Sequence, residues 1–232
     1  MKTTGAQQLV IEIGPATSVS AILIRPTDAR ACFVFAHGAG AGMTHPFMET
    51  VAAGLGERGV ASLRYQFPYM EKVSRRPDPP AIAHAAVRAA VAQAARCCRG
   101  LTLIAGGKSF GGRMTSQAQA AAPLAGVQGL AFLGFPLHPA GKPSDDRAKH
   151  LSDVHIPKLF VQGTRDSLAE MKLLEPVVTR LGPSASLHRI EGADHSFHVP
   201  ARSGLNDREA MTDILDTLAA WIGAIAAKAA AF

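Results

Sequence analysis

One serine lies between glycines in a pattern typical of a catalytic nucleophile. The segment Gly107-Lys108-Ser109-Phe110-Gly111 follows an apolar run over residues 101–105 and precedes a predicted helix over residues 110–122. Small residues two positions before and after the serine permit a sharp turn from strand to helix, which exposes the hydroxyl beside free backbone N–H groups. A serine hydroxyl attacks a carbonyl only when a base accepts its proton and an acid orients that base. The sequence must therefore supply both partners.

Asp166 and His195 are the predicted acid and base. Each follows a predicted strand, over residues 158–162 and 187–190 respectively, and the chain order Ser, Asp, His is typical of serine nucleophiles at such turns. Neighbouring side chains tend to point apart, so Asp194 is a poor orienter of His195. His198 is an alternative base, although it lies further from the strand end. The remaining candidate acids lie in an apparently irregular segment: Asp145, Asp146 and Asp153.

Acyl transfer also needs N–H donors that stabilise the oxyanion. We expect one from Phe110, the residue after the nucleophile. We expect the other from the loop His37-Gly38-Ala39-Gly40, which follows the apolar run over residues 32–36. Ala39 is our choice, and Gly38 and Gly40 remain alternatives. The same loop could instead be a tight turn without chemistry.

Phosphate and metal binding are not indicated. Gly107-Lys108-Ser109 resembles the end of a P-loop, but Thr102 stands where that motif requires glycine. No carboxylate or cysteine cluster completes a metal site with His195 and His198. We therefore predict neither a metal nor an organic cofactor. Lys108 is expected to point away from the serine, because it occupies the adjacent position of the strand end.

Strand and helix patterns alternate along the chain, which favours an α/β fold with a mostly parallel sheet covered on both faces. The predicted strands span residues 8–13, 19–25, 32–36, 60–65, 101–105, 129–135, 158–162 and 187–190. Helices are predicted over residues 46–58, 79–98, 110–122 and 168–181, and a last helix begins at Asn206 and Glu209 with a capping box. We find no internal repeat or linker, so residues 1–232 are predicted to form a single domain.

Composition excludes several classes of protein. The 232 residues are 47% hydrophobic and 18% charged, which excludes general disorder. No uninterrupted apolar run approaches the roughly 20 residues of a membrane span, and no signal peptide is recognisable. The 24 Lys and Arg residues exceed the 18 Asp and Glu residues by six, a net charge of +6, but they are dispersed, so no nucleic-acid partner is expected. Three cysteines suit a reducing compartment, and a cytoplasmic location is predicted.

Taken together, these motifs resemble the α/β-hydrolase superfamily, and in particular its small lidless members similar to dienelactone hydrolase. The resemblance extends to His45-Pro46-Phe47 and Pro136-Leu137-His138-Pro139. It implies a mostly parallel sheet of about eight strands with Ser109, Asp166 and His195 as the triad. Dienelactone hydrolase itself has cysteine at the position of Ser109, so its lactone substrate is not carried over.

The predicted function is hydrolysis of small carboxylic esters or thioesters through an acyl-enzyme. The roughly 20 residues 136–155 are too few and too polar for a large lid, which favours an open site for small acyl groups. We expect His37, Gly38 and His138 to contact the substrate. Some members of the superfamily are non-catalytic, so an interaction or binding module is the alternative. The sequence does not specify the oligomeric state.

Overall fold

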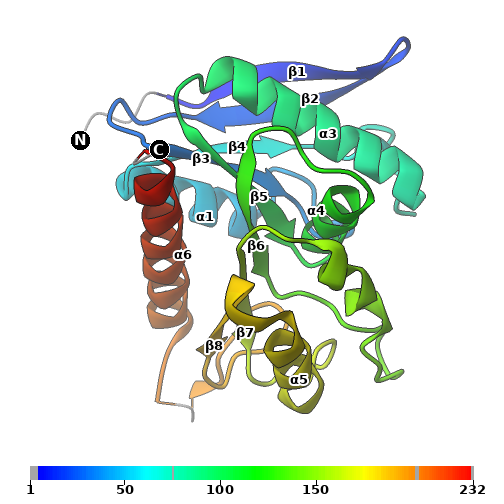
Figure 1. Cartoon of the computed structure of the whole chain (residues 1–232), viewed down its shortest axis with the longest axis vertical. Coiled ribbons are helices and arrows are strands. Elements are labelled where there is room, and N and C mark those ends of the chain that lie inside the picture. Colours follow the sequence, from blue (N-terminus) through cyan, green and yellow to red (C-terminus); the bar gives the residue numbers. More distant parts are fainter. Residues whose placement is uncertain (1–4, 75, 202–203, 231–232) are drawn as a thin grey trace.

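An eight-stranded sheet forms the centre of the molecule (Figure 1). The computed structural model describes residues 5–74, 76–201 and 204–230. The strands are β1 (Gln7–Gly14), β2 (Thr17–Ile24), β3 (Ala31–Ala36), β4 (Val60–Tyr65), β5 (Thr102–Lys108), β6 (Val127–Leu133), β7 (Lys158–Gly163) and β8 (Ala185–Ile190). Their order is β1-β2-β4-β3-β5-β6-β7-β8. Only the β1–β2 and β2–β4 pairs are antiparallel, so six strands from β4 to β8 are parallel and their carboxyl ends lie along one edge.

Helices cover both faces of the sheet, as Figure 1 shows. The helices are α1 (Pro46–Glu57), α2 (Pro68–Glu71), α3 (Pro80–Cys97), α4 (Phe110–Ala121), α5 (Met171–Leu181) and α6 (Asp207–Ala229), with 3₁₀ segments η1 (Asp146–Asp153) and η2 (Gly182–Ser184). Helices α3, α4 and α5 pack on one face, and α1 and α6 pack on the other. The side chains of β3 alternate between these two faces. Cys32 and Val34 belong to the apolar core under α3, α4 and α5, while Phe33 and Phe35 belong to the core under α1 and α6. A strand buried on both faces is continuously apolar.

The α/β prediction is confirmed, with local differences at element ends. Strand β5 continues to Lys108, because Gly106 and Gly107 still pair with β3 and β6. Strand β6 begins and ends two residues earlier than expected. The segment expected to be irregular contains η1, whose Ala148 and Leu151 are buried, and the short helix α2 was not predicted. Helix α2 has four residues and η1 has eight, so neither shows the extended apolar period that identifies a helix in sequence.

The last helix begins with the predicted capping box. The Asn206 side chain accepts hydrogen bonds from the N–H groups of Arg208 and Glu209, and the Glu209 carboxylate accepts one from Asn206 N–H at 3.0 Å. By length and composition alone, α6 could cross a membrane, since one 18-residue window has a mean hydropathy of 1.3. However, Ile214, Leu218 and other residues of one helix face are buried against the sheet. Core helices of soluble proteins meet the same criterion, so this feature is weak support for a membrane span.

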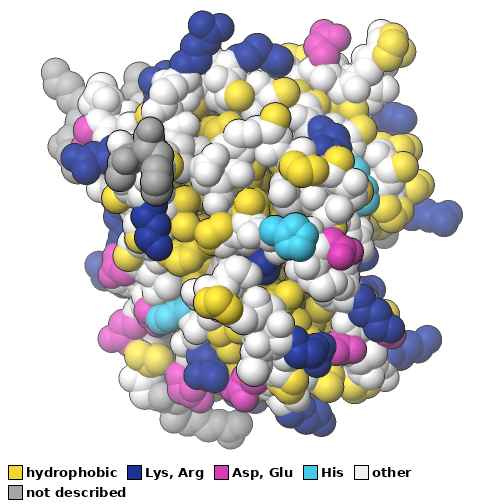
Figure 2. Space-filling view, viewed as in Figure 1, with side chains coloured by type: hydrophobic (Ala, Val, Ile, Leu, Met, Phe, Trp, Pro, Cys, Tyr) yellow, Lys and Arg dark blue, Asp and Glu magenta, His cyan; other side chains and the backbone are white. Residues whose placement is uncertain are grey.

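Charged side chains are dispersed over the surface. On the face shown in Figure 2, Lys and Arg are scattered among acidic and apolar groups, with no continuous basic stripe. Nucleic acids bind concentrated basic surfaces. This face has no such surface.

Two glycines allow β3 and the start of α4 to approach closely. A Cβ atom added to Gly107 or Gly111 would lie 2.4 Å and 2.5 Å from the carbonyl oxygen of Ala36. The contacted atom belongs to the backbone of β3, so it cannot move aside as the end of a flexible side chain could. The spacing of glycines around Ser109 therefore has a packing cause as well as a conformational one.

We expect Gly111→Ala to lower the free energy of unfolding by about 1–3 kcal/mol through overpacking. The matched control is Gly223→Ala, because a Cβ there meets nothing within 4 Å and the site lies inside α6. Alanine should stabilise that helix by up to about 1 kcal/mol. Urea unfolding of the two variants measures both effects. Equal changes of the same sign would show that the contact with Ala36 does not constrain the fold.

Candidate active site

Ser109 occupies a strained turn between β5 and α4. Its backbone φ is 48°, a left-handed conformation that is uncommon for residues other than glycine. Its N–H donates to the Leu133 carbonyl oxygen at 3.1 Å, which ties the turn to the end of β6. Strain of this kind persists where the surrounding structure enforces it, often at functional sites. The turn directs the hydroxyl toward the loop that follows β8.

Ser109, His195 and Asp166 form one hydrogen-bonded chain. The distance between His195 Nε2 and Ser109 Oγ is 2.9 Å, and that between His195 Nδ1 and Asp166 Oδ2 is 2.7 Å. The Asp166 carboxylate is buried, whereas the His195 side chain is 25% exposed. Asp166 follows β7 and His195 follows β8, so the carboxyl ends of parallel strands bring together the three residues that the sequence singled out.

The alternative acids and bases have other partners. Asp194 Oδ1 accepts hydrogen bonds from the N–H groups of Ser196 and His198, and so shapes the His195 loop rather than contacting the imidazole. The exposed His198 side chain is paired with Asp207 at 2.9 Å, which raises the pKa of His198. Neither residue competes with the chain formed by Ser109, His195 and Asp166.

Gln162 holds Asp166 and was not predicted from the sequence. Its Nε2 donates to Asp166 Oδ2 at 2.5 Å, while its Oε1 accepts the N–H of Phe135 at 2.8 Å. The other carboxylate oxygen, Oδ1, accepts the N–H of Leu168 at 2.8 Å. A buried carboxylate needs such donors. The sequence gives no sign of this role, because Gln162 resembles any polar residue near the end of a strand.

Lys108 points into the site, contrary to the prediction that it would point away. Its Nζ donates to the His195 carbonyl oxygen at 2.6 Å and lies 5.3 Å and 5.9 Å from the ring centroids of Phe197 and Phe47. The flexible stem lets a residue at the strand end bend toward the next loop. Burial lowers the pKa of Lys108 to about 8, against the opposing effect of the Asp166 and Asp194 carboxylates. Lys108 thus connects the serine turn to the histidine loop.

The two residues expected to supply oxyanion donors, Ala39 and Phe110, line a cavity together with Ser109. Phe110 begins α4, where the first N–H groups have no acceptor within the helix. In the described part of the chain, no acceptor is found for Ala39 N–H, whereas Gly40 N–H donates to the Tyr69 hydroxyl at 2.9 Å. This difference favours Ala39 over Gly40, and the assignment of both donors remains a prediction.

His37 and His138, expected to contact substrate, are placed elsewhere. His37 is fully buried: its Nδ1 lies 2.7 Å from the Gly38 carbonyl oxygen and its Nε2 accepts Phe67 N–H at 3.1 Å. Burial lowers the pKa of His37 to about 4, so the ring is neutral and supports the backbone. His138 is buried and bonded to Glu170 at 2.6 Å and to the Pro139 carbonyl oxygen at 2.9 Å. Only Gly38 of the three lines a cavity beside Ser109.

Two cavities meet at Ser109 and Ala39. The first, of about 370 Å³, is lined by Gly38, Ala39, Ala41, His45, Phe47, Met48, Lys108, Ser109, His195 and Ser196. The second, of about 380 Å³, is lined by Ala39, Pro77, Asp78, Pro80, Ser109, Phe110, Arg113, Met114, Pro136, Arg147 and Leu168. Ser109 therefore lines two compartments, of which the first is also lined by His195 and the second is not.

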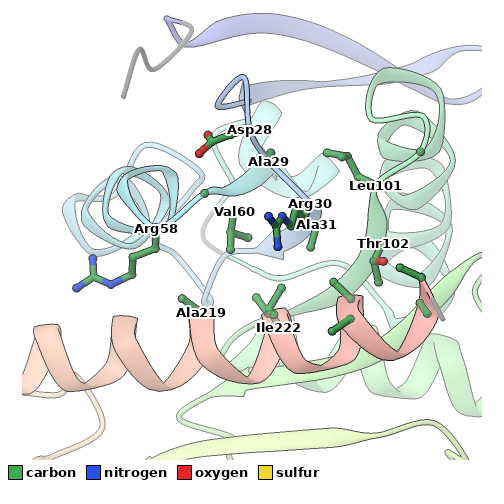
Figure 3. Close-up of a pocket in the computed structure, with 17 residues that line it drawn as sticks. Asp28, Ala29, Arg30, Ala31, Arg58, Val60, Leu101, Thr102, Ala219 and Ile222 are labelled. Carbon is green, nitrogen blue, oxygen red and sulfur yellow. The ribbon is translucent and has the colours of Figure 1, made fainter.

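A larger cavity, of about 830 Å³, lies at the opposite edge of the sheet (Figure 3). Its walls include Ala31, Val60 and Thr102, the first residues of β3, β4 and β5, and Ala219 and Ile222 of α6. Ligands of open parallel sheets bind at the carboxyl ends of the strands. The position of this cavity separates it from Ser109.

Metal ligands are not grouped in the described residues. Across residues 5–74, 76–201 and 204–230, no cluster of three or more His, Cys, Asp or Glu side chains could hold an ion. The absence of a metal or an organic cofactor from the reaction remains a prediction.

Comparison with known families matches this arrangement. A family model described as an alpha/beta hydrolase domain matches residues 29–223. The chain belongs to this alpha/beta hydrolase family. The match covers every element from β3 to the middle of α6, including the loops that carry Ser109, Asp166 and His195.

Solved alpha/beta hydrolases share the fold over almost the whole chain. Dienelactone hydrolase from Anabaena variabilis is 22% identical, with a TM-score of 0.77 over 94% of this chain and 96% of that one. A serine hydrolase without a lid from Xanthomonas campestris is 20% identical, with a TM-score of 0.69 and coverage of 97% and 95%. An esterase domain from Rhodothermus marinus is 15% identical, with a TM-score of 0.70 and coverage of 94% and 98%. The predicted similarity to small hydrolases of the dienelactone hydrolase type is confirmed.

The buried ammonium of Lys108 should affect stability in a pH-dependent way. Its pKa is about 8 in the folded hydrolase, against 10.5 for an ordinary lysine, so between these values the unfolded chain binds more protons. The contribution of this group to the free energy of unfolding therefore rises as pH increases from 8 to 10.5. Urea unfolding of wild type and Lys108→Met at pH 7 and pH 10 should show the wild type gaining relative to the variant at the higher pH.

The exposed Lys172 provides the control for that measurement, through Lys172→Met. The free energy of unfolding of this variant should change between pH 7 and pH 10 by the same amount as that of the wild type. A Lys108→Met difference that is identical at pH 7 and pH 10 would contradict a buried, depressed ammonium.

Proposed function

We propose that this alpha/beta hydrolase cleaves small carboxylic esters or thioesters through an acyl-enzyme. The observation that carries the proposal is the continuous chain of hydrogen bonds from Ser109 through His195 to the buried Asp166. A base within 2.9 Å of a hydroxyl can accept its proton as the oxygen attacks. The acid at 2.7 Å fixes the ring tautomer and stabilises the imidazolium.

In the first half-reaction, Ser109 Oγ forms a bond to the carbonyl carbon and its proton moves to His195 Nε2. The resulting oxyanion accepts hydrogen bonds from the N–H groups of Ala39 and Phe110. When the bond to the leaving oxygen or sulfur breaks, His195 gives its proton to that atom. Water then attacks the acyl-enzyme by the same route, which releases the acid and restores Ser109.

Small substrates are favoured by the size and shape of the site. The two cavities at Ser109 measure about 370 and 380 Å³, and η1 together with its flanking turns is too short to form a helical lid. We propose that the substrate is a soluble small molecule and that no metal or organic cofactor takes part. A long acyl chain would extend beyond the walls into water.

Covalent labelling tests the proposed nucleophile. Treatment of the folded protein with a fluorophosphonate should join phosphorus to Ser109 Oγ with loss of fluoride, and mass spectrometry of the digest should locate the adduct on the peptide that contains Ser109. Ser109→Ala should lower kcat for p-nitrophenyl butyrate at least about a thousandfold, since the remaining site keeps only binding and oxyanion stabilisation.

The exposed Ser152 supplies a matched control, because Ser152→Ala removes a hydroxyl that donates to the Lys149 carbonyl oxygen and lines neither cavity at Ser109. It should leave kcat unchanged. Wild type that neither reacts with the probe nor cleaves short p-nitrophenyl esters would favour the alternative, a binding module that keeps the hydrolase fold.

A further inference from the structure

The second cavity at Ser109 contains two guanidinium groups without an acidic partner. Arg113 projects from the first turns of α4, and Arg147 projects from η1. Within the described residues, no carboxylate oxygen lies within 4.0 Å of either guanidinium. The Nε atom of Arg113 is buried and has no hydrogen-bond partner there. An uncompensated charge at a partly buried position is costly, so its presence needs a cause.

The acidic residues next to Arg147 are engaged by other cations. Asp145 pairs with Arg180 at 2.5 Å, and Asp146 pairs with Lys149 at 2.6 Å. Both pairs direct negative charge away from the cavity. The arrangement leaves Arg147 free to face Arg113, and the charge of Arg147 contributes to lowering the pKa of Arg113, after the larger effect of burial.

The other polar groups around the pair are a neutral imidazole and one carboxylate. Burial, reinforced by the charge of Arg113, lowers the pKa of His150 to about 4, so this imidazole is neutral near pH 7. Asp78 lines the same cavity, and its Oδ2 accepts Tyr69 N–H at 2.9 Å. Two arginines and one aspartate leave the cavity with a charge of about +1, which suits a monoanion.

Proton transfer decides which half of a substrate enters this cavity. His195 must protonate the leaving atom, and only the first cavity is lined by His195. The leaving group therefore belongs in the first cavity and the acyl group in the second. The second cavity has Met114, Pro136 and Leu168 as apolar walls between Ser109 and the arginines. A short methylene chain fits such walls.

We propose that Arg113 and Arg147 bind a carboxylate at the far end of the acyl group, so that the preferred substrates are monoesters or monothioesters of short dicarboxylic acids. This inference rests on the proposed serine hydrolase activity. A planar guanidinium matches a carboxylate through paired N–H donors. The Arg113 guanidinium lies over the Phe110 ring, with Cζ 5.8 Å from the ring centroid, which is a cation–π contact.

Two substrates of equal chain length test the inference. Monoethyl glutarate ends in a carboxylate where ethyl valerate ends in a methyl group, and a pH-stat measures hydrolysis of both. Hydrogen bonds to charged groups change equilibria by about 10- to 100-fold. We expect kcat/KM of the wild type to favour monoethyl glutarate by at least about tenfold. Arg113→Met and Arg147→Met, which lie on separate elements, should each reduce this ratio about tenfold.

Arg96→Met is the matched control, because it removes one exposed arginine that is bonded to Gln93 and does not line this cavity. It should retain the wild-type ratio, which separates a local contact from the general loss of positive charge. A wild-type ratio of one or less, or a ratio unchanged in both cavity variants while ethyl valerate is cleaved, would overturn the inference and leave the serine hydrolase proposal intact.

A binding measurement separates failure of the inference from failure of the proposed function. Calorimetry should detect binding of monoethyl glutarate to the Ser109→Ala variant. The double variant with Arg113→Met should bind this ester about tenfold or more weakly. If the wild type cleaves no ester and this loss is still seen, the anion site stands and the hydrolase proposal fails. Undetectable binding to Ser109→Ala, or equal binding with and without Arg113, rejects the anion site whatever the catalytic result.

Discussion

The close approach of β3 and α4 is the constraint on which the rest of the site depends. Gly107 and Gly111 lie against the carbonyl oxygen of Ala36, too near for any side chain. Ala36 ends β3 and leads directly into the loop of Ala39, so the same contact sets the distance between the nucleophile and the expected oxyanion donor. A side chain at either glycine would separate Ser109 from the loop of Ala39, the two groups that act on one carbonyl in the proposed reaction.

The acid and base are aligned by polar contacts that cross between loops. Strand β8 is an edge strand with partly exposed residues, and apolar packing alone fixes it weakly. Gln162 joins Asp166 to the turn after β6 through Phe135, while Lys108 joins the serine turn to the His195 carbonyl. Buried polar networks of this kind rigidify a site when each member is satisfied. The geometry of Ser109, His195 and Asp166 therefore depends on residues outside this set.

The predictable part of this molecule is the part that depends on periodicity and local conformation. Short apolar and β-branched runs between turn residues located all eight strands, and glycine spacing located the turn at Ser109. Periodicity and glycine spacing did not predict which way side chains point at the carboxyl ends of the strands. Lys108 bends toward His195, and His37 bonds backbone atoms of Gly38 and Phe67, because of neighbours that are distant in sequence. His37 was expected to contact the substrate only because it adjoins the glycine-rich loop in the sequence.

Charge shows most clearly what tertiary structure adds. A net charge of +6 spread along the chain suggests only a mildly basic surface. The fold places Lys108 on one side of Ser109 and Arg113 with Arg147 on the other, while the buried carboxylate of Asp166 faces the imidazole. In the proposed reaction, negative charge that develops on the carbonyl oxygen would thus form between cations in a partly water-excluded site, where electrostatic interactions are stronger than in bulk water. Within the described residues Arg113 and Arg147 have no carboxylate within 4.0 Å, and an anion that forms or binds between them would offset the cost of holding these two charges.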